Sequence, residues 1–356
     1  MLRELTKKLR EKGDLAYQEV GIAVESLIDE KIPPEIKADF LIALNQKGET
    51  VNEIEAFAKK LKSYSIAPPI SKELRNRPII DVCGTGGDKL GTINISSAVA
   101  IIVASAGVCV VKHGNRAATS KSGSADVFEA LGIKIVLSPE EAAEWLENYN
   151  FAFLFAPHYH PAFKHIAPAR KICGSLGHLT IFNFLGPLFN PANPNCQIIG
   201  VPNPDLCEPM ARALQRLGVL RGMVVCGRIT DKHEKSPEQV HHLDEVSING
   251  RTIVAEFYNE KEVNRSELDS SIFPVKFQSI DELRGGDSAT NAGIMTEIFQ
   301  GKIKGGKRDI IQLNAAAALF VAGAAQSIID GWELAGELID SGAALKKMQE
   351  LIKASK

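Results

Sequence analysis

The sequence predicts an α/β protein in which a small all-helical N-terminal domain precedes a larger α/β domain with a central, mostly parallel sheet flanked by helices. Residues 1 to about 64 place their apolar side chains at helical spacing only. From Pro78 onward, short apolar runs alternate with helical segments, which is typical of a parallel sheet covered on both faces. The length of 356 residues suits one or two domains.

Local signals place the N-terminal helices. Pro33-Pro34 opens a helix, Gly48 closes it, and Thr50 caps the next one. Two prolines in the stretch 63–69 predict a linker. We therefore expect a helical domain over residues 1–68 and an α/β domain over residues 69–356.

The α/β region reads as an ordered series of strands and helices. Expected strands are 78–83, 108–112, 133–137, 151–156, 196–201 and 222–226. Expected helices are 96–106, 123–131, 138–148 and 205–217, followed by long alanine-rich helices from 310 to 352. The third of these begins with a capping box, Ser138 to Glu141.

Composition excludes several classes of protein. The 41 basic and 43 acidic side chains give a net charge of −2, whereas nucleic-acid binders usually carry a basic excess. The six cysteines include no CxxC pair, so zinc and thioredoxin-type sites lack support, and reduced cysteines in a cytoplasmic protein are expected. The charged N-terminus does not resemble a signal peptide. The most apolar run, 98–111, is shorter than the ~20 residues of a membrane span.

Three polar loops lie at predicted strand ends and helix starts. The sequence GTGGD at 84–88 follows a strand and precedes a helix whose start contains Thr92, Asn94, Ser96 and Ser97. KHGNR at 112–116 ends the next strand, and TSKSGSAD at 119–126 opens the following helix. Glycines, hydroxyls and helix N-termini at the carboxyl edge of a parallel sheet suit a phosphate group. The three loops together predict a phosphate-binding site.

Two further groups add chemistry to this edge. Asp244 and Glu245 are adjacent carboxylates after a polar stretch, and beside phosphate loops they predict a Mg²⁺ site. Arg170 has the two-pronged donor geometry that suits a planar carboxylate. It follows the sequence HYHP at 158–161 and precedes NFLGP at 183–187.

Taken together, these motifs resemble the anthranilate phosphoribosyltransferase family. The similarity includes GTGGD with T-x-NISS, KHGNR, TSKSGSADVFEALG, APHYHPA, APAR, TIFNFLGPLFNPA and HLDE. It also includes ALNQKGET near the N-terminus, GGD at 285–287 and RDIIQLNAAAALFVAG. The resemblance extends from about Phe40 to the C-terminus.

The resemblance implies an activity and a set of site residues. The family transfers phosphoribose from 5-phosphoribosyl 1-pyrophosphate to anthranilate in tryptophan biosynthesis. Residues expected to hold phosphoribosyl pyrophosphate are Gly84, Gly86, Gly87, Asp88, Thr92, Asn94, Ser96, Ser97, Lys112, Thr119, Ser120, Ser122, Gly123 and Ser124. Residues expected to line the anthranilate path are Gly84, His113, Asn115, His160 and Arg170. Mg²⁺ is expected at Ser96, Asp244 and Glu245.

The resemblance also implies a mechanism and an assembly. The amine of anthranilate is neutral at pH 7, so no essential general base is expected, and His113 is the candidate for an assisting role. Family members usually form homodimers through the helical domain, which part of residues 165–190 is expected to join. No nucleic-acid or membrane partner is expected. Leu179 departs from the arginine that many relatives have before TIFN.

Two alternatives stay open at this point. A pyrimidine-nucleoside phosphorylase on the same scaffold would use a nucleoside and free phosphate, but Asn115, Arg170 and the intact Asp244-Glu245 pair argue against it. A non-catalytic nucleic-acid-binding relative would be expected to lose GTGGD or the acidic pair and to gain a basic surface.

Overall fold

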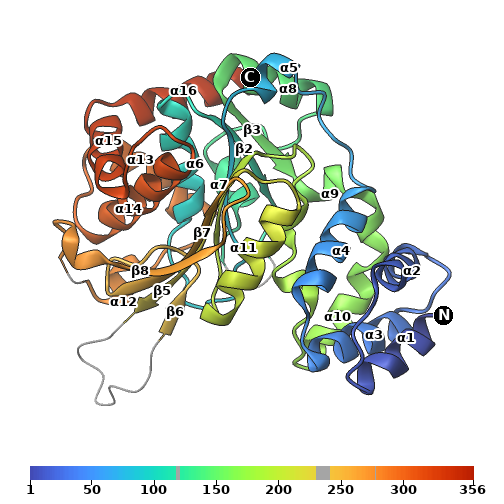
Figure 1. Cartoon of the computed structure of the whole chain (residues 1–356). Coiled ribbons are helices and arrows are strands. Elements are labelled where there is room, and N and C mark those ends of the chain that lie inside the picture. Colours follow the sequence, from blue (N-terminus) through green and yellow to red (C-terminus); the bar gives the residue numbers. More distant parts are fainter. Residues whose placement is uncertain (118–120, 230–240, 277) are drawn as a thin grey trace.

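Helices cover both faces of one twisted sheet, and a separate group of helices lies to one side of it (Figure 1). The structure is a computed structural model that describes residues 1–117, 121–229, 241–276 and 278–356. The expected strand–helix alternation places the sheet in the middle of the larger part of the chain.

The strands form one sheet in which parallel pairing dominates. They are β1 (Ile79–Gly84), β2 (Cys109–Gly114), β3 (Phe151–Phe155), β4 (Cys196–Gly200), β5 (Arg221–Ile229), β6 (His241–Leu243), β7 (Arg251–Tyr258) and β8 (Asn264–Asp269). Their order is β3-β2-β1-β4-β5-β7-β8, and β6 pairs with β5. Strands β1 to β5 pair in parallel, whereas β6, β7 and β8 join antiparallel. The prediction of a mostly parallel sheet flanked by helices is confirmed.

The N-terminal region is helical, as predicted. It contains α1 (Leu2–Arg10), α2 (Tyr17–Ile28), α3 (Pro34–Lys47) and α4 (Val51–Lys62). Gly48 ends α3 with a φ of +91°, and the Thr50 hydroxyl caps α4 by accepting a hydrogen bond from the Glu53 amide. The buried Glu53 carboxylate also accepts from Lys47 Nζ at 2.7 Å and from the Leu15 amide at 2.9 Å. These contacts hold the turn between α3 and α4.

The other helices follow along the chain to the C-terminus, and several of them pack against the sheet. They are α5 (Lys72–Arg75), α6 (Ile95–Ser105), α7 (Ser124–Ala130), α8 (Pro139–Tyr149), α9 (Ala156–Tyr159), α10 (Ala167–Ser175), α11 (Cys207–Arg216), α12 (Ile280–Leu283), α13 (Ser288–Phe299), α14 (Gly306–Val321), α15 (Ile328–Asp340) and α16 (Ala343–Ala354). Short 3-10 helices are η1 (Pro161–His165), η2 (Ile181–Asn183), η3 (Gly186–Phe189), η4 (Pro204–Leu206) and η5 (Ser270–Ile272). Helix α10 packs against α3, so this later segment lies beside the N-terminal helices (Figure 1).

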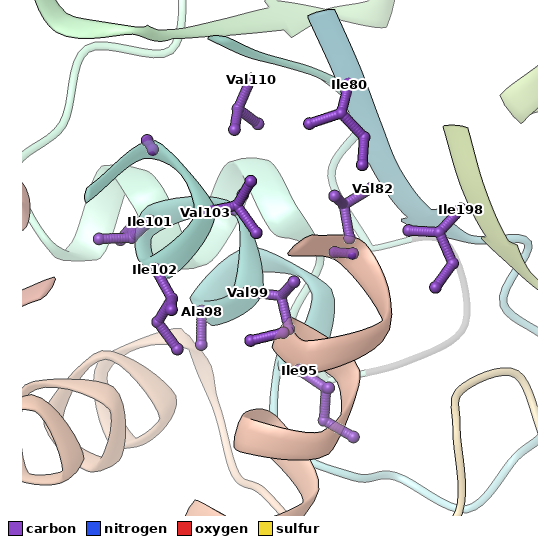
Figure 2. Packing of buried hydrophobic residues seen from close by; sticks show 14 of the residues in the cluster. Ile80, Val82, Ile95, Ala98, Val99, Ile101, Ile102, Val103, Val110 and Ile198 are labelled. Atoms are coloured by element: carbon purple, nitrogen blue, oxygen red, sulfur yellow. The ribbon is translucent and has the colours of Figure 1, made fainter. Parts of the chain in front are cut away.

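Two apolar cores lie on opposite faces of the sheet. On one face, α6 packs against β1, β2 and α14, and its side chains Val99, Ile102 and Val103 are fully buried (Figure 2). On the other face, α11 joins the sheet to the core of α1–α4 and α10. Because α6 is apolar all round, it can be buried on every side while its N-terminus points to the sheet edge.

Two features of the sheet differ from the sequence prediction. The strand predicted at 133–137 is wrong: Ile133, Ile135 and Leu137 are buried in alternation, but β3 occupies the place beside β2. The backbone of this segment bonds to side chains instead, since Lys134 N donates to Ser355 Oγ and Leu137 O accepts from the Tyr159 hydroxyl. Strands β7 and β8 were not predicted. Their antiparallel pairing extends the sheet beyond the strand–helix repeat.

None of the helices in the described part of the chain combines the length and the apolar character that crossing a lipid bilayer requires.

The packing of α6 leads to a stability prediction. Ile102→Ala should lower the free energy of unfolding by about 2–5 kcal/mol, because it leaves a cavity in a fully buried position. The matched control is Ile329→Ala on α15, an isoleucine that is half exposed, which should change stability by less than about 0.5 kcal/mol. Urea unfolding measures both, and equal effects of the two variants would contradict this description of the core.

Candidate active site

The site lies where strands β1, β2 and β4 end in glycine at the same edge of the sheet. Gly84, Gly114 and Gly200 are the last residues of these strands. A Cβ on Gly84 or on Gly200 would overlap Asp244, which packs directly against both strand ends. The Gly86 amide donates to Asp244 Oδ2 at 2.7 Å. The segment after β6 is thereby fixed against the first glycine-rich loop, across 158 residues of sequence.

Gly200 was not predicted as a site residue. It follows a buried strand, but its sequence neighbours give no sign that another segment must approach it. The β4–β1 pairing brings it opposite Gly84, which did belong to a recognisable motif. A glycine that ends a strand next to such a motif is the one signal that could have pointed to it.

Three carboxyl groups and one ammonium group meet here. Burial, together with the charge of the neighbouring Asp88, raises the pKa of Asp244 to about 8. Burial and the charge of Asp244 hold the pKa of Glu245 well above its usual range, while Lys112 opposes this effect. Asp88 Oδ2 is buried and has no hydrogen-bond donor within the described residues while Asp244 is ionised. A bound cation or bound protons would therefore stabilise this cluster of carboxyl groups.

Lys112 is buried beneath this cluster. Its ammonium group donates hydrogen bonds to the Val82 carbonyl and to Ser96 Oγ, the latter at 3.1 Å. Burial lowers the pKa of Lys112, while the neighbouring Cys83, Asp81 and Glu245 oppose that change. Lys112 thus lies behind the loops, where it offsets the carboxylates and positions Ser96.

The first loop and the start of α6 provide hydrogen-bond donors. Asn94 is the N-cap residue of α6, and Ser96 and Ser97 lie in its first turn. Ser97 Oγ is buried without a partner within the described residues. Thr92 forms an antiparallel bridge with Arg284, so its main chain is held by a distant segment. Gly86 and Gly87 have φ values of +74° and +94°, in the region that favours glycine.

The KHGNR segment and the start of α7 are held together by the carboxylate of Asp126. Asp126 Oδ2 accepts from the Ala117 amide at 2.8 Å and from the Gly123 amide at 2.9 Å. Arg116 donates to Asp126 at 3.1 Å and to Glu129 at 2.7 Å, so its side chain also connects the end of the KHGNR segment to α7. Asn94 Nδ2 donates to the Ser122 carbonyl at 3.1 Å, so the two loops are in contact. Thr119 and Ser120 lie outside the described residues.

A cluster of aromatic rings adjoins the loops. His113 Nε2 and His160 Nε2 lie 3.1 Å apart, and both rings are buried. Burial lowers the pKa of His113 to about 3 and that of His160 to about 4. Both rings are therefore neutral near pH 7, and one Nε2 donates to the other. Phe189 meets both histidine rings edge-on, with centroids 5.9 Å and 5.0 Å away.

The aromatic series extends from the histidines to Arg170. Phe163 stacks on His160 with centroids 5.0 Å apart, and Phe182 lies 6.0 Å from Phe163. The Arg170 guanidinium lies 5.6 Å from the centre of the Phe182 ring. Arg170 has no ion-pair partner in the part of the chain that the structure describes. An aromatic surface with a cation at its far end is suited to a planar aromatic acid.

A buried polar network that was not predicted contacts the strand of His113 and the segment that carries Phe189. Asp81 is fully buried, and its carboxylate accepts from Asn190 Nδ2 at 2.9 Å and from the His113 amide at 3.3 Å. Asn190 Nδ2 also donates to the Val111 carbonyl at 2.9 Å. Burial raises the pKa of Asp81 to about 6. This network holds β1, β2 and the segment of Phe189 in one arrangement. An aspartate inside an apolar strand was its only sequence signal.

Two family models match the helical and the α/β parts of the chain separately. Residues 3–65 match the helical bundle domain of a glycosyl transferase family, and residues 76–345 match its a/b domain. Anthranilate phosphoribosyltransferase of Petrotoga mobilis is 44% identical over 99% of this chain and 96% of its own length. The enzyme of Methanosarcina mazei is 43% identical over 98% of this chain and 88% of its own.

The chain belongs to the anthranilate phosphoribosyltransferase family. Among solved structures, the enzyme of Thermus thermophilus matches with a TM-score of 0.85 and 35% identity, over 99% of each chain. The enzyme of Saccharomyces cerevisiae in complex with PRPP and Mg matches with a TM-score of 0.85 and 26% identity. It covers 99% of this chain and 97% of that one. The phosphorylase and nucleic-acid alternatives are not favoured by these relatives.

The raised pKa of Asp244 leads to a pH prediction. In the folded protein Asp244 keeps its proton up to about pH 8, whereas the unfolded chain loses it near the ordinary value of 3.8. The folded state then binds more protons between these values, so this group makes stability fall as pH rises. The lowered pKa values of His113 and His160 make stability rise with pH, but only below the ordinary histidine pKa of 6.5. In EDTA, wild-type stability should therefore fall from pH 6.5 to 7.5 more steeply than that of Asp244→Asn. Chemical unfolding across this range measures both slopes, and parallel slopes would contradict the assignment.

Proposed function

We propose that this chain transfers the phosphoribosyl group of 5-phosphoribosyl 1-pyrophosphate to the amine of anthranilate, giving N-(5-phosphoribosyl)anthranilate and pyrophosphate, in tryptophan biosynthesis. The observation that carries the proposal is the meeting of Asp244 and Glu245 with the Gly84–Asp88 loop, next to a neutral cluster of aromatic rings. A highly charged substrate and a flat apolar one would each have a matching surface there.

The loops are proposed to hold phosphoribosyl pyrophosphate. Backbone amides of the first loop, the start of α6 and the residues from Ser122 to Ser124 supply donors for the phosphate groups. Lys112 supplies positive charge from beneath the loops. The contact of Asn94 with the Ser122 carbonyl supports a joint role for the two loops, because a ligand between them would meet donors from both.

The acidic cluster fits Mg²⁺. Asp244, Glu245 and Asp88 offer hard oxygen atoms, and Asp88 Oδ2 is a buried acceptor without a donor in the described structure. Among the described residues, no three His, Cys, Asp or Glu side chains are arranged as a metal-binding group by themselves, so Mg²⁺ held by these carboxylates would need further oxygen ligands, such as water. Ser96 would complete the set. When bound, Mg²⁺ would neutralise the pyrophosphate that departs.

Anthranilate is proposed to bind along the aromatic series. Arg170 would take its carboxylate with two parallel hydrogen bonds, and the rings from Phe182 to His160 would contact its benzene ring. Gly84 ends β1 and Asn115 directly follows β2, so both lie where the polar loops begin. The amine would then face the phosphoribosyl group.

The reaction needs positioning more than proton transfer. The C1–N bond forms as the bond from C1 to pyrophosphate breaks, and the amine loses one proton to water or to the departing pyrophosphate. The lowered pKa of His113 makes it a weak base at pH 7. His113 and His160 would instead fix the orientation of the amine through their neutral rings.

The division into a helical domain of 1–68 and an α/β domain of 69–356 is also part of this proposal, with α10 packed against α3 on the helical side. We further propose that two copies pair through the helical domain, and that the enzyme works in the cytoplasm without a nucleic-acid or membrane partner. The net charge of −2 supports the absence of a nucleic-acid partner.

The activity is tested by the loss of anthranilate fluorescence with phosphoribosyl pyrophosphate and Mg²⁺. We expect turnover that stops in EDTA and falls at least about 100-fold in Asp244→Asn/Glu245→Gln, because the departing pyrophosphate loses its charge neutralisation. The matched control is Glu208→Gln on α11, an exposed carboxylate that should keep full activity. A folded wild type with no turnover would contradict the proposed reaction.

Arg170 provides a test of the anthranilate site. Arg170→Gln should raise the KM for anthranilate about 10- to 100-fold, because a charge-assisted hydrogen bond contributes about 1.5–3 kcal/mol. The KM for phosphoribosyl pyrophosphate should stay unchanged. Arg212→Gln on α11, which removes only an exposed pair with Glu208, is the control. Steady-state kinetics with each substrate varied in turn would contradict the assignment if both KM values rose equally.

A further inference from the structure

The stretch between the first loop and α6 is supported by a segment that comes much later in the sequence. Residues 91–93 run beside residues 283–285: Gly285 N donates to the Gly91 carbonyl at 2.9 Å, and Ile93 N donates to the Leu283 carbonyl at 3.2 Å. Thr92 and Arg284 form an antiparallel bridge between these two contacts. The second glycine motif of the sequence, GGD at 285–287, therefore supports the first.

Asn291, on the first turn of α13, completes this contact with its side chain. It is buried at 3% exposure. Its Oδ1 accepts from the Gly286 amide at 2.8 Å, and its Nδ2 donates to Asn94 Oδ1, also at 2.8 Å. A Cβ on Gly285 would press against the Asn291 amide, which accounts for a glycine at that position.

The bond from Asn291 fixes which way the Asn94 amide faces. Because Asn94 Oδ1 accepts from Asn291, its Nδ2 group must point to the other side, where it donates to the Ser122 carbonyl at 3.1 Å. An amide NH₂ group has two hydrogens, so one remains for a ligand between the loops. If the amide were reversed, an oxygen would face the Ser122 carbonyl and would repel an anion.

We propose that Asn291 is a positioning residue for the phosphoribosyl pyrophosphate site, acting through the Asn94 amide. It keeps the donor end of Asn94 directed at the space between the start of α6 and the Ser122–Ser124 segment. The inference rests on the proposed function, which assigns that space to the phosphates. Asn291 itself bonds to Asn94 and to the Gly286 main chain.

Asn291→Asp is the direct test, since the change is nearly isosteric. An aspartate still accepts from the Gly286 amide but cannot donate to Asn94 Oδ1. The Asn94 amide should turn over to donate to the new carboxylate and lose its bond to Ser122. The KM for phosphoribosyl pyrophosphate should then rise about tenfold, as expected for the loss of one hydrogen bond. The KM for anthranilate should not change. A general loss of stability would not raise one KM value and leave the other unchanged.

The matched control is Thr296→Val on the same helix. Within the described part of the chain, the Thr296 hydroxyl bonds to the Ala292 carbonyl one turn back, so its loss removes a polar group from α13 without reaching the site. Its two KM values should equal those of the wild type. If Asn291→Asp does not fold, Asn291→Ser replaces it, because serine removes the bond to Asn94 without adding a charge.

The outcomes separate this inference from the proposed reaction. If the wild type has no turnover, the reaction is wrong, and titration calorimetry with magnesium pyrophosphate then tests Asn291 alone. About tenfold weaker binding by the folded Asn291 variant, with binding by Thr296→Val unchanged, would support the inference. Unchanged pyrophosphate binding, an unchanged KM for phosphoribosyl pyrophosphate in an active variant, or an equal rise of both KM values would overturn it.

Discussion

The rest of the site depends on the close approach of the Asp244 main chain to the ends of β1 and β4. Any side chain at Gly84 or Gly200 would push this segment away from the sheet. The approach places two carboxylates over the first loop, and the Gly86 amide bonds to one of them. It also encloses Lys112, whose charge is needed where so many acidic groups are buried. Strand pairing thus sets the electrostatics of the site.

The two halves of the site have opposite electrostatic character. The loop half gathers carboxylates, an ammonium group and main-chain donors, and the carboxyl pKa values rise because these groups are buried together. The other half is formed by aromatic rings, and the two histidines there are uncharged near pH 7. A site divided in this way can hold a polyanion and a flat, weakly basic amine side by side without either half disturbing the other.

Much of this arrangement could be predicted from the sequence, and the exceptions have physical reasons. The parallel strands, the caps at Thr50 and Ser138 and the three polar loops are local patterns, so the sequence displays them directly. The strand expected at 133–137 was wrong because alternation shows burial but not which partner a strand will find. Gly200, Asp81 and Asn291 were missed because each acts through a segment distant in sequence. A single buried polar residue or glycine does not show what it will contact.

The separation in sequence of the parts that meet at the sheet edge has a consequence for synthesis of the chain. Gly86 bonds to Asp244 across 158 residues, and Asn94 bonds to Asn291 across 197. A nascent chain that ends just after the loops still lacks the Asp244 segment and the Asn291 segment that contact them. Under the proposed function, the binding site of the loops would be complete only after about four-fifths of the chain has been synthesised, and contacts of such long range slow folding. Substrate can therefore favour the finished enzyme but gives no help to its earlier intermediates.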